Sequence, residues 1–446
     1  MTRRIVHLGV GNFHRAHQAW YTARANAAMG SDWRITGVSL RRPDIRDALR
    51  PQAFRYTLEI EDEAGTAYES VDVIETVIVA TEAPEAVVAA IADAQTFVVT
   101  LTVTEKGYSL HPSDRKLNFD DAGIAADLAG GPPRTTIGML AAGLAARRAA
   151  GNDGLTVLCC DNLPENGHVL AAAVTAFAGR TDAGLAAWIG DNVAFPCSMV
   201  DRIVPATTDE LRDRVEHATG SRDAWPVATE RFTQWVIEDR FAGPRPAWEA
   251  VGAELVDDVS PYEVRKLRML NGAHSTLAYG GLLAGLTYVH EAVADADLAR
   301  LARAVMAEAA ATLPDGVRAT ADDYADLLMR RFANPGLAHA LIQIAMDGSQ
   351  KLPIRLVAPL SERLAAGLPS PAMERALACW IGFVIRTARE GGALNDPLGA
   401  VLVAAATGVP PAEAAGRLLA MEQIFAGFAA DQAEAAARII ERAATL

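Results

Sequence analysis

The stretch RIVHLGVGNFHRAH, residues 4–17, decides the fold, because an apolar run leads into a glycine-rich turn and then into a helical pattern. Arg4–Leu8 predicts a strand and Arg15–Met29 predicts a helix, with Gly9 and Gly11 between them. In a dinucleotide-binding βαβ unit, the first glycine permits a tight turn and the second lets the backbone approach the pyrophosphate. The residues predicted to lie beside a dinucleotide are Gly9, Gly11, Asn12 and Phe13.

The third glycine of this fingerprint is replaced by His14, so an ordinary strand–helix turn stays an alternative. His14 and His17 stand three residues apart, a spacing that would also place two metal ligands on one face of a helix. No neighbouring residues complete a set of three or four ligands, so the sequence predicts no metal site. We expect both histidines to pack at the start of the helix or to hydrogen-bond beside the phosphates.

The choice between NAD and NADP depends on the end of the second predicted strand, Trp33–Leu40. About 20 residues beyond the glycine turn, the fingerprint places an acid on the ribose 2′-hydroxyl. Asp44 could bind that hydroxyl, whereas Arg41 and Arg42 could meet the 2′-phosphate of NADP. Arg41 and Asp44 are therefore predicted cofactor contacts, and the residues leave both cofactors open.

The rest of the chain divides into two patterns. Up to about residue 258, short apolar runs alternate with helical segments, which indicates βαβ units and a mostly parallel sheet. The further predicted elements of this part are strands at Val71–Ala80, Phe97–Val103 and Leu155–Cys160, and helices at Pro84–Asp93 and Ile137–Ala149. Beyond it the predicted helices are Glu263–Leu283, Ala292–Thr312, Ala321–Phe332, Pro371–Glu390 and Ala430–Ala444. We predict an α/β dinucleotide-binding domain over 1–258 and an all-helical substrate domain over 259–446.

The bulk composition excludes several classes of protein. With 51% hydrophobic and 22% charged residues, the chain is typical of a folded globular protein. Its formal net charge of -14 provides no general attraction for nucleic acid or an anionic membrane. No apolar run approaches the roughly 20 residues of a membrane span, and the N-terminus lacks the apolar stretch of a signal peptide. We expect a cytoplasmic protein with a small-molecule substrate, and the oligomeric state stays open.

The first predicted helix of the second part has an unusual mixture of polar residues. At about 100° per residue, Glu263, Asn271 and His274 lie within about 140° of Lys266, all on one side. A solvated amphipathic helix would also carry such charges. A polar cleft needs this mixture if it handles an alcohol proton, because a lysine can transfer the proton and carboxamides can stabilise an oxyanion.

The roles that this chemistry requires can be assigned to named residues. Lys266 would be the acid and base, with Glu263 passing its proton to solvent. Asn271 and Asn162 would hold the developing oxyanion, since Asn162 follows a predicted parallel strand at the sheet edge where open α/β sheets bind ligands. His274 would hold a neighbouring hydroxyl of the substrate.

Five segments resemble the polyol-specific long-chain dehydrogenases, the mannitol dehydrogenase family: residues 9–17, 101–108, 160–162, 195–204 and 266–274. The resemblance implies a Rossmann-type domain followed by a helical domain, metal-independent hydride transfer and usually NAD. It implies the same roles for Lys266, Asn162, Asn271, His274 and Glu263. It further implies that Asp201 lies near the substrate and that Lys351 reaches the substrate's far end.

Within the family, three segments are more similar to the fructuronate reductase branch: residues 37–41, 232–239 and 344–353. Gln343 stands where the mannitol branch would be expected to carry an arginine, and it is a predicted substrate contact. We therefore expect reduction of D-fructuronate to D-mannonate, whose carboxylate must be paired by a basic group such as Lys351, Arg331 or Arg355. A neutral polyol dehydrogenase is the alternative, and a nicotinamide-binding sensor without turnover is a remote one.

Overall fold

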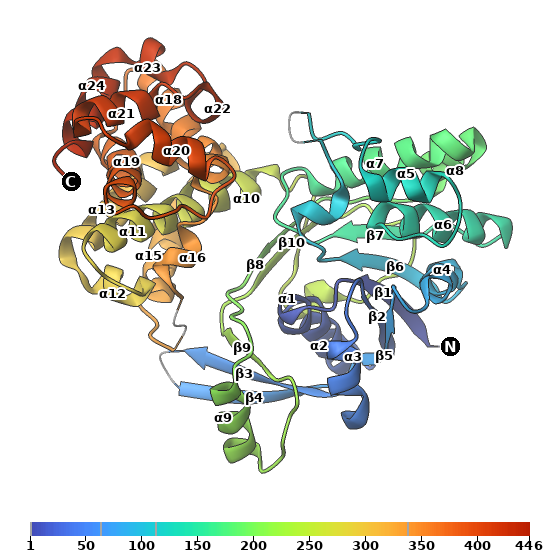
Figure 1. Cartoon of the computed structure of the whole chain (residues 1–446). Helices are drawn as coiled ribbons and strands as arrows, with labels where there is room; N and C mark the ends of the chain where they lie inside the picture. The colour runs from blue at the N-terminus through green and yellow to red at the C-terminus, as the bar shows by residue number, and fades with distance from the viewer. Residues whose placement is uncertain (1, 63–64, 112–113, 337–338) are drawn as a thin grey trace. The chain divides into compact units, whose positions relative to one another are not determined.

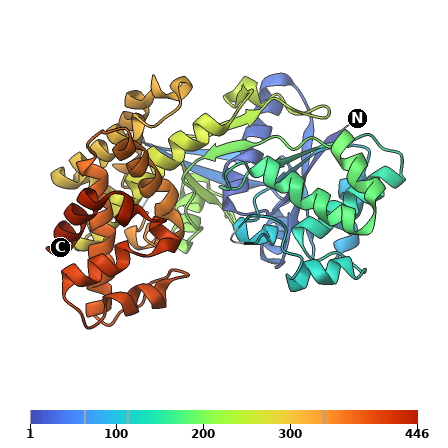
Figure 2. The same cartoon turned by 90° about the horizontal axis from the view of Figure 1, so that it is seen from above.

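The computed structural model describes residues 2–62, 65–111, 114–336 and 339–446, and it divides into two compact units (Figures 1 and 2). The first unit is Met1–Ser260 and the second is Pro261–Leu446. None of the described helices is both long enough and apolar enough to cross a membrane.

The first unit is built on a five-stranded parallel sheet in the order β5-β2-β1-β6-β7 (Figure 1). The strands are β1 (Arg3–Leu8), β2 (Trp33–Ser39), β5 (Ile74–Val79), β6 (Thr96–Leu101) and β7 (Thr156–Cys159). The strand order reverses between β1 and β6, which makes their carboxyl ends the switch point where such sheets bind ligands. The predicted α/β, Rossmann-type sheet is confirmed.

Burial on both faces explains why these strands are almost continuously apolar. Val6 and Val99 belong to one core, with α4 (Pro84–Ala92), α6 (Thr136–Ala149) and α7 (Asn166–Thr181). Their neighbours Ile5 and Val98 belong to the other core, with α2 (Gln18–Met29). The other helices of this unit are α1 (Asn12–Ala16), α3 (Asp44–Leu49), α5 (Ala122–Leu128), α8 (Ala183–Asn192), α9 (Asp209–Thr219), and the short η1 (Arg50–Gln52), η2 (Glu105–Tyr108) and η3 (Trp248–Val251).

Two three-stranded sheets in the first unit were not predicted. One has the order β4-β3-β9, from β3 (Tyr56–Asp62), β4 (Gly65–Val71) and β9 (Val227–Glu230). The other has the order β11-β10-β8, from β8 (Ser198–Asp201), β10 (Gln234–Glu238) and β11 (Glu254–Val256). The predicted strand Val71–Ala80 was wrong at its start, because Val71 ends β4 and β5 begins only at Ile74. A local apolar pattern cannot separate two strands that belong to different sheets.

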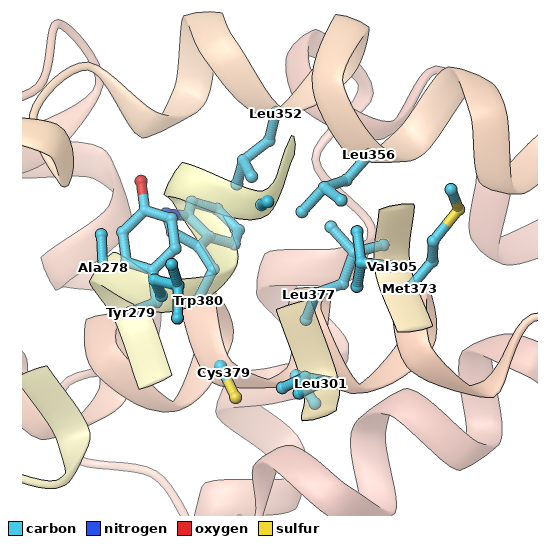
Figure 3. Close-up of a cluster of buried hydrophobic side chains, with 14 of the residues drawn as sticks. Ala278, Tyr279, Leu301, Val305, Leu352, Leu356, Met373, Leu377, Cys379 and Trp380 are labelled. Atoms are coloured by element: carbon cyan, nitrogen blue, oxygen red, sulfur yellow. The ribbon is translucent and has the colours of Figure 1, made fainter. Parts of the chain in front are cut away.

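In the second unit every regular element of the described residues is a helix, as predicted. Figure 3 shows its core, where Trp380, Leu377 and Tyr279 pack among aliphatic side chains. The elements are α10 (Ser260–Arg265), η4 (Lys266–Asn271), α11 (Gly272–Leu283), α12 (Val289–Ala294), α13 (Ala296–Ala310), α14 (Asp315–Arg318), α15 (Ala321–Phe332), α16 (Leu341–Ile344), α17 (Gly348–Leu352), η5 (Pro353–Val357), α18 (Ala358–Ala365), α19 (Pro371–Arg389), α20 (Gly399–Ala406), α21 (Pro411–Leu419), α22 (Glu422–Phe425), α23 (Phe428–Asp431) and α24 (Ala433–Ala443).

Four of the predicted helices differ from the structure. Arg15–Met29 spans the end of α1 and all of α2, and Ala430–Ala444 spans the end of α23 and all of α24. The other two differ as follows. Ala292–Thr312 was predicted as one helix, but Asp295 caps α13 by accepting hydrogen bonds from the N–H groups of Asp297 and Leu298. The helix over Glu263–Leu283 is continuous but contains a π-helical segment, Lys266–Asn271. The assumed 100° per residue is therefore wrong across this segment, because a π turn contains more residues than an α turn.

Candidate active site

The turn after β1 fits the predicted dinucleotide loop at both glycines. Gly9 has a φ of 100°, and a Cβ there would lie 2.1 Å from the carbonyl oxygen of Thr102. Only glycine is compatible with that conformation and that contact. A Cβ on Gly11 would meet nothing nearer than the Gly9 carbonyl oxygen at 3.9 Å. The protein itself therefore leaves space at Gly11, as expected where a ligand approaches the backbone.

The two histidines after this turn pack inside the protein. The His14 ring stacks on the ring of His7 with centroids 3.3 Å apart, and His14 is fully buried. The His17 Nε2 lies 3.0 Å from the carbonyl oxygen of Gln234. Burial lowers the pKa of His7 to about 3 and the pKa of His14 well below its usual value, so both rings are neutral at neutral pH. The role at the helix start is therefore packing.

The other predicted cofactor residues are held by protein groups or exposed. The Asn12 amide donates to the carbonyl oxygen of Pro205 at 3.0 Å, which fixes the start of α1. The Phe13 ring stacks on His17 at 5.0 Å. Arg41 is exposed, and exposed Asp44 forms an ion pair with Arg42 at 2.9 Å. That pair gives neither a 2′-hydroxyl nor a 2′-phosphate a decisive partner, so these residues still favour neither cofactor.

The carboxyl end of β7 carries the predicted Asn162, whose side chain is exposed. Its neighbour Asp161 was not predicted as a functional residue. The Asp161 carboxylate accepts hydrogen bonds from the loop after β6, including one of 2.5 Å from the Tyr108 hydroxyl. The only signal in the sequence for Asp161 was its position, as a strongly polar residue between a buried strand and the predicted substrate contact Asn162. Asp201 is buried at the end of β8, opposite Gln234 of β10.

The second unit holds the predicted proton-transfer residues on one continuous helical segment. Lys266 is 8% exposed and begins the π-helical segment, and His274 is 7% exposed in α11. Glu263 and Asn271 are half-buried. π-helical segments occur frequently at functional sites. A buried lysine and a buried imidazole so close in sequence exclude the alternative of a solvated amphipathic helix.

The surroundings of His274 are strongly basic. Its Nε2 is buried and has no hydrogen-bond partner among the described residues, and its ring packs 4.4 Å from Phe332 and 5.6 Å from His339. Burial lowers the pKa of His274 well below its usual value, and its neighbours His339, Arg331 and Arg355 lower it further. The imidazole is therefore neutral, with one polar atom for which the described part of the chain provides no hydrogen bond.

The three basic residues named for a substrate carboxylate differ in their contacts. The Arg355 guanidinium donates to the Ser275 hydroxyl at 3.1 Å, directly beside His274. Arg331 is 7% exposed. The Lys351 Nζ donates to the carbonyl oxygen of Met346 at 2.6 Å. Burial lowers the pKa of nearby His339, and the Lys351 charge lowers it further. These contacts bring the three cations around the imidazole pair of the same unit. His339 was missed from the sequence, where a lone histidine in a loop gave no signal.

Gln343 has different surroundings from the basic residues near His274. It is exposed and lines a cavity of about 200 Å³ with Ile342, Met346 and Asn395. The lining of that cavity includes none of Lys266, Asn271 and His274.

Within the described residues, one cluster has the side-chain types of a metal site: His168, Cys197 and Glu238. The Arg240 guanidinium lies 3.1 Å from the His168 Nε2 and 2.5 Å from the Glu238 carboxylate. A cation therefore already neutralises this cluster, and a metal would have to compete with it.

The comparisons with known proteins agree with both units. The mannitol dehydrogenase Rossmann domain matches residues 3–250, and the mannitol dehydrogenase C-terminal domain matches residues 258–445. D-mannonate oxidoreductase of Escherichia coli strain K12 is 41% identical over 405 residues, which cover 89% of this chain and 83% of that protein. Mannitol 2-dehydrogenase of Phaeosphaeria nodorum is 40% identical over 416 residues, covering 91% and 73%.

A solved structure extends the similarity to the backbone. The Pseudomonas fluorescens mannitol 2-dehydrogenase, in a ternary complex with NAD and D-mannitol, is 36% identical with a TM-score of 0.85. The match covers 100% of this chain and 92% of that one. The chain therefore belongs to the mannitol dehydrogenase family of oxidoreductases, as its motifs predicted.

Proposed function

We propose that this oxidoreductase reduces D-fructuronate to D-mannonate with NADH, in a reversible hydride transfer. The observation that carries the proposal is the pair of positive charges near His274, from the Arg331 and Arg355 guanidinium groups. A carboxylated sugar provides the opposite charge, and guanidinium groups are the strongest partners for a carboxylate. The 41% identity to a D-mannonate oxidoreductase supports the same substrate class.

The two parts of the chain would divide the work. Residues 1–258 would bind the dinucleotide, with the pyrophosphate against Gly9 and Gly11, and with Asn12, Phe13, Arg41 and Asp44 at its border. Residues 259–446 would bind the sugar and transfer its proton. The open space at Gly11 supports dinucleotide binding, since a Cβ there would have no close protein neighbour.

The proposed chemistry follows from the side chains. NADH, when bound, supplies a hydride to the carbonyl carbon. Lys266 donates a proton to the carbonyl oxygen in reduction and removes it in oxidation, and Glu263 exchanges that proton with solvent. The carboxamides of Asn162 and Asn271 donate to the oxygen while it carries negative charge. Neutral His274 offers its Nε2 to an adjacent hydroxyl, and Asp201 and Lys351 contact the rest of the sugar. Gln343 is given no contact with the sugar, because it lines a separate cavity.

A neutral polyol is the second candidate substrate. It is favoured by the solved mannitol 2-dehydrogenase complex with D-mannitol, whose match covers the whole chain. The same side chains would act on a polyol, but the positive charges near His274 would then lack a partner on the substrate.

The deciding experiment follows NADH absorbance with D-fructuronate and with D-fructose, and repeats both with NADPH. We expect kcat/KM to be at least tenfold higher for fructuronate with NADH, because only fructuronate pairs with the cationic groups. The reverse reaction compares mannonate with mannitol and arabinitol. Faster turnover of fructose would assign the chain to the polyol dehydrogenases. A matched Arg355→Gln variant should lose more activity with fructuronate than with fructose.

A further inference from the structure

The Asp161 carboxylate joins the ends of two neighbouring strands. Asp161 follows β7 and precedes Asn162. Its oxygens accept hydrogen bonds from the Val103 N–H at 2.8 Å, the Thr104 N–H at 3.0 Å and the Tyr108 hydroxyl at 2.5 Å. All three donors lie in the segment that follows β6. One side chain therefore fixes the segment after β6 to the end of β7.

The segment so fixed has a strained backbone at Thr104. Its φ of 67° lies in the left-handed region, which a β-branched residue rarely adopts. Such a conformation persists only where surrounding contacts maintain it. The Thr104 side chain is exposed, so the hydrogen bond from its N–H to Asp161 is a contact that can maintain the conformation.

The same segment borders the dinucleotide turn. The Thr102 hydroxyl donates to the Gly9 carbonyl oxygen at 2.9 Å, and the Thr102 carbonyl is the group that excludes a Cβ at Gly9. Asp161 thus belongs to a set of contacts that links the carboxyl ends of β1, β6 and β7. These ends surround the switch point of the sheet.

Tyr108 completes the arrangement from the interior. It is fully buried, and its hydroxyl lies 2.9 Å from the Cys159 Sγ as well as 2.5 Å from Asp161. Burial raises the pKa of Asp161, while its three donors favour the ionised form. A carboxylate that accepts three bonds from its own chain is suited to holding a structure in place.

We propose that Asp161 is a positioning residue, which holds the strained segment after β6 and thereby fixes the neighbouring Asn162 carboxamide for the substrate oxygen. This inference rests on the proposed function, because it assigns Asp161 a role through Asn162. The carboxylate itself touches the protein and takes no part in the transfer of hydride or proton.

The test is a double-mutant cycle with Asp161→Asn, Asn162→Ala and the double variant. The Val103 and Thr104 N–H groups donate to different oxygens of the Asp161 carboxylate, and asparagine keeps only one of these oxygens, so one of the two hydrogen bonds is lost. We expect kcat to fall about 100-fold in Asp161→Asn, because displacing a positioned group by about 1 Å has an effect of this size. The NADH dissociation constant should stay nearly constant. The double variant should be no slower than Asn162→Ala, since coupled residues are not additive. Multiplying losses would overturn the positioning role.

A second measurement does not depend on turnover. Hydrogen exchange of the Val103 and Thr104 amides should be slow in the wild type and clearly faster in Asp161→Asn; fast exchange in the wild type would overturn the inference.

If Asp161→Asn does not fold, the Tyr108→Phe variant provides the test, because it removes only one of the three donors to Asp161. Tyr108→Phe should lower kcat less than Asp161→Asn does, and it should not lower kcat further in the Asn162→Ala background. A further decrease in that background would contradict the positioning role. A wild type inactive on every sugar refutes the proposed function, whereas an active wild type with an equally active Asp161→Asn refutes only the positioning role.

Discussion

At the residue scale, the proposed chemistry depends on Lys266, a buried lysine at the first position of a π-helical segment. Burial of a lysine is costly, and it is found chiefly where the amine is paired or used. His274 shares this burial, and within the ranges that the structure describes its Nε2 has no hydrogen-bond partner. These two side chains are therefore the ones to which the proposed proton handling of the second unit is assigned.

Replacing Lys266 by alanine should abolish most turnover without affecting the dinucleotide. We expect kcat to fall by about 10²- to 10⁴-fold, the usual contribution of a positioned acid or base. The NADH dissociation constant, measured by fluorescence titration, should be unchanged, because the proposed dinucleotide loop belongs to the first unit. Lys116→Ala, at an exposed lysine, is the control and should keep the wild-type rate. A Lys266→Ala enzyme with wild-type kcat would remove the proposed acid and base.

At the scale of elements, the turn between β1 and α1 shows how one glycine serves the fold and another leaves room for a ligand. Gly9 is required by its positive φ and by the Thr102 carbonyl oxygen. Gly11 has an extended backbone and space around its Cα. The two positions should therefore respond differently to the same substitution.

Gly9→Ala should destabilise the first unit by about 1–3 kcal/mol, because alanine is strained at this φ and clashes with Thr102. Thermal unfolding would show this as a lower Tm. Gly11→Ala should keep the wild-type Tm but weaken NADH binding at least tenfold, because the added methyl occupies the space proposed for the pyrophosphate. Equal NADH affinity in Gly11→Ala and the wild type would argue against a dinucleotide at this turn.

At the scale of the whole molecule, neutral buried histidines connect stability to pH. His7, His14 and His274 have pKa values lowered by burial, His7 to about 3. In the unfolded chain each would bind a proton near pH 6.5. The unfolded state therefore binds more protons below pH 6.5, and acid favours unfolding.

The free energy of unfolding should thus be unaffected by these groups above pH 6.5 and should decrease as pH falls toward the folded pKa values. Each histidine contributes a slope of up to about 1.4 kcal/mol per pH unit. Urea unfolding between pH 4.5 and 7.5 measures the slope. His7→Asn, which cannot titrate, should reduce it, whereas His217→Gln, at an exposed histidine, should not. An unchanged slope in His7→Asn would contradict the assignment.

Features that depend only on residues close together in the chain could be predicted. The β1 strand, the GxG turn and α15 follow from local periodicity, glycine and proline, so they could be predicted within a few residues. The motif from Lys266 to His274 was likewise identified from its residue types and spacing. Distant pairing gave no such signal: β3 pairs with β9 across more than 150 residues, and both small sheets were missed.

The contacts that hold the site residues in place depend on long-range packing and could not be predicted. The π-helical segment Lys266–Asn271 packs against a second π-helical segment, η5. A Cβ on Gly272 would lie only 3.3 Å from the Arg355 carbonyl oxygen of η5. The Thr102 carbonyl over Gly9 and the Asp161 bonds to Thr104 also join residues far apart in the chain. Such contacts form only when packing brings distant segments together, because no short stretch of sequence contains both partners.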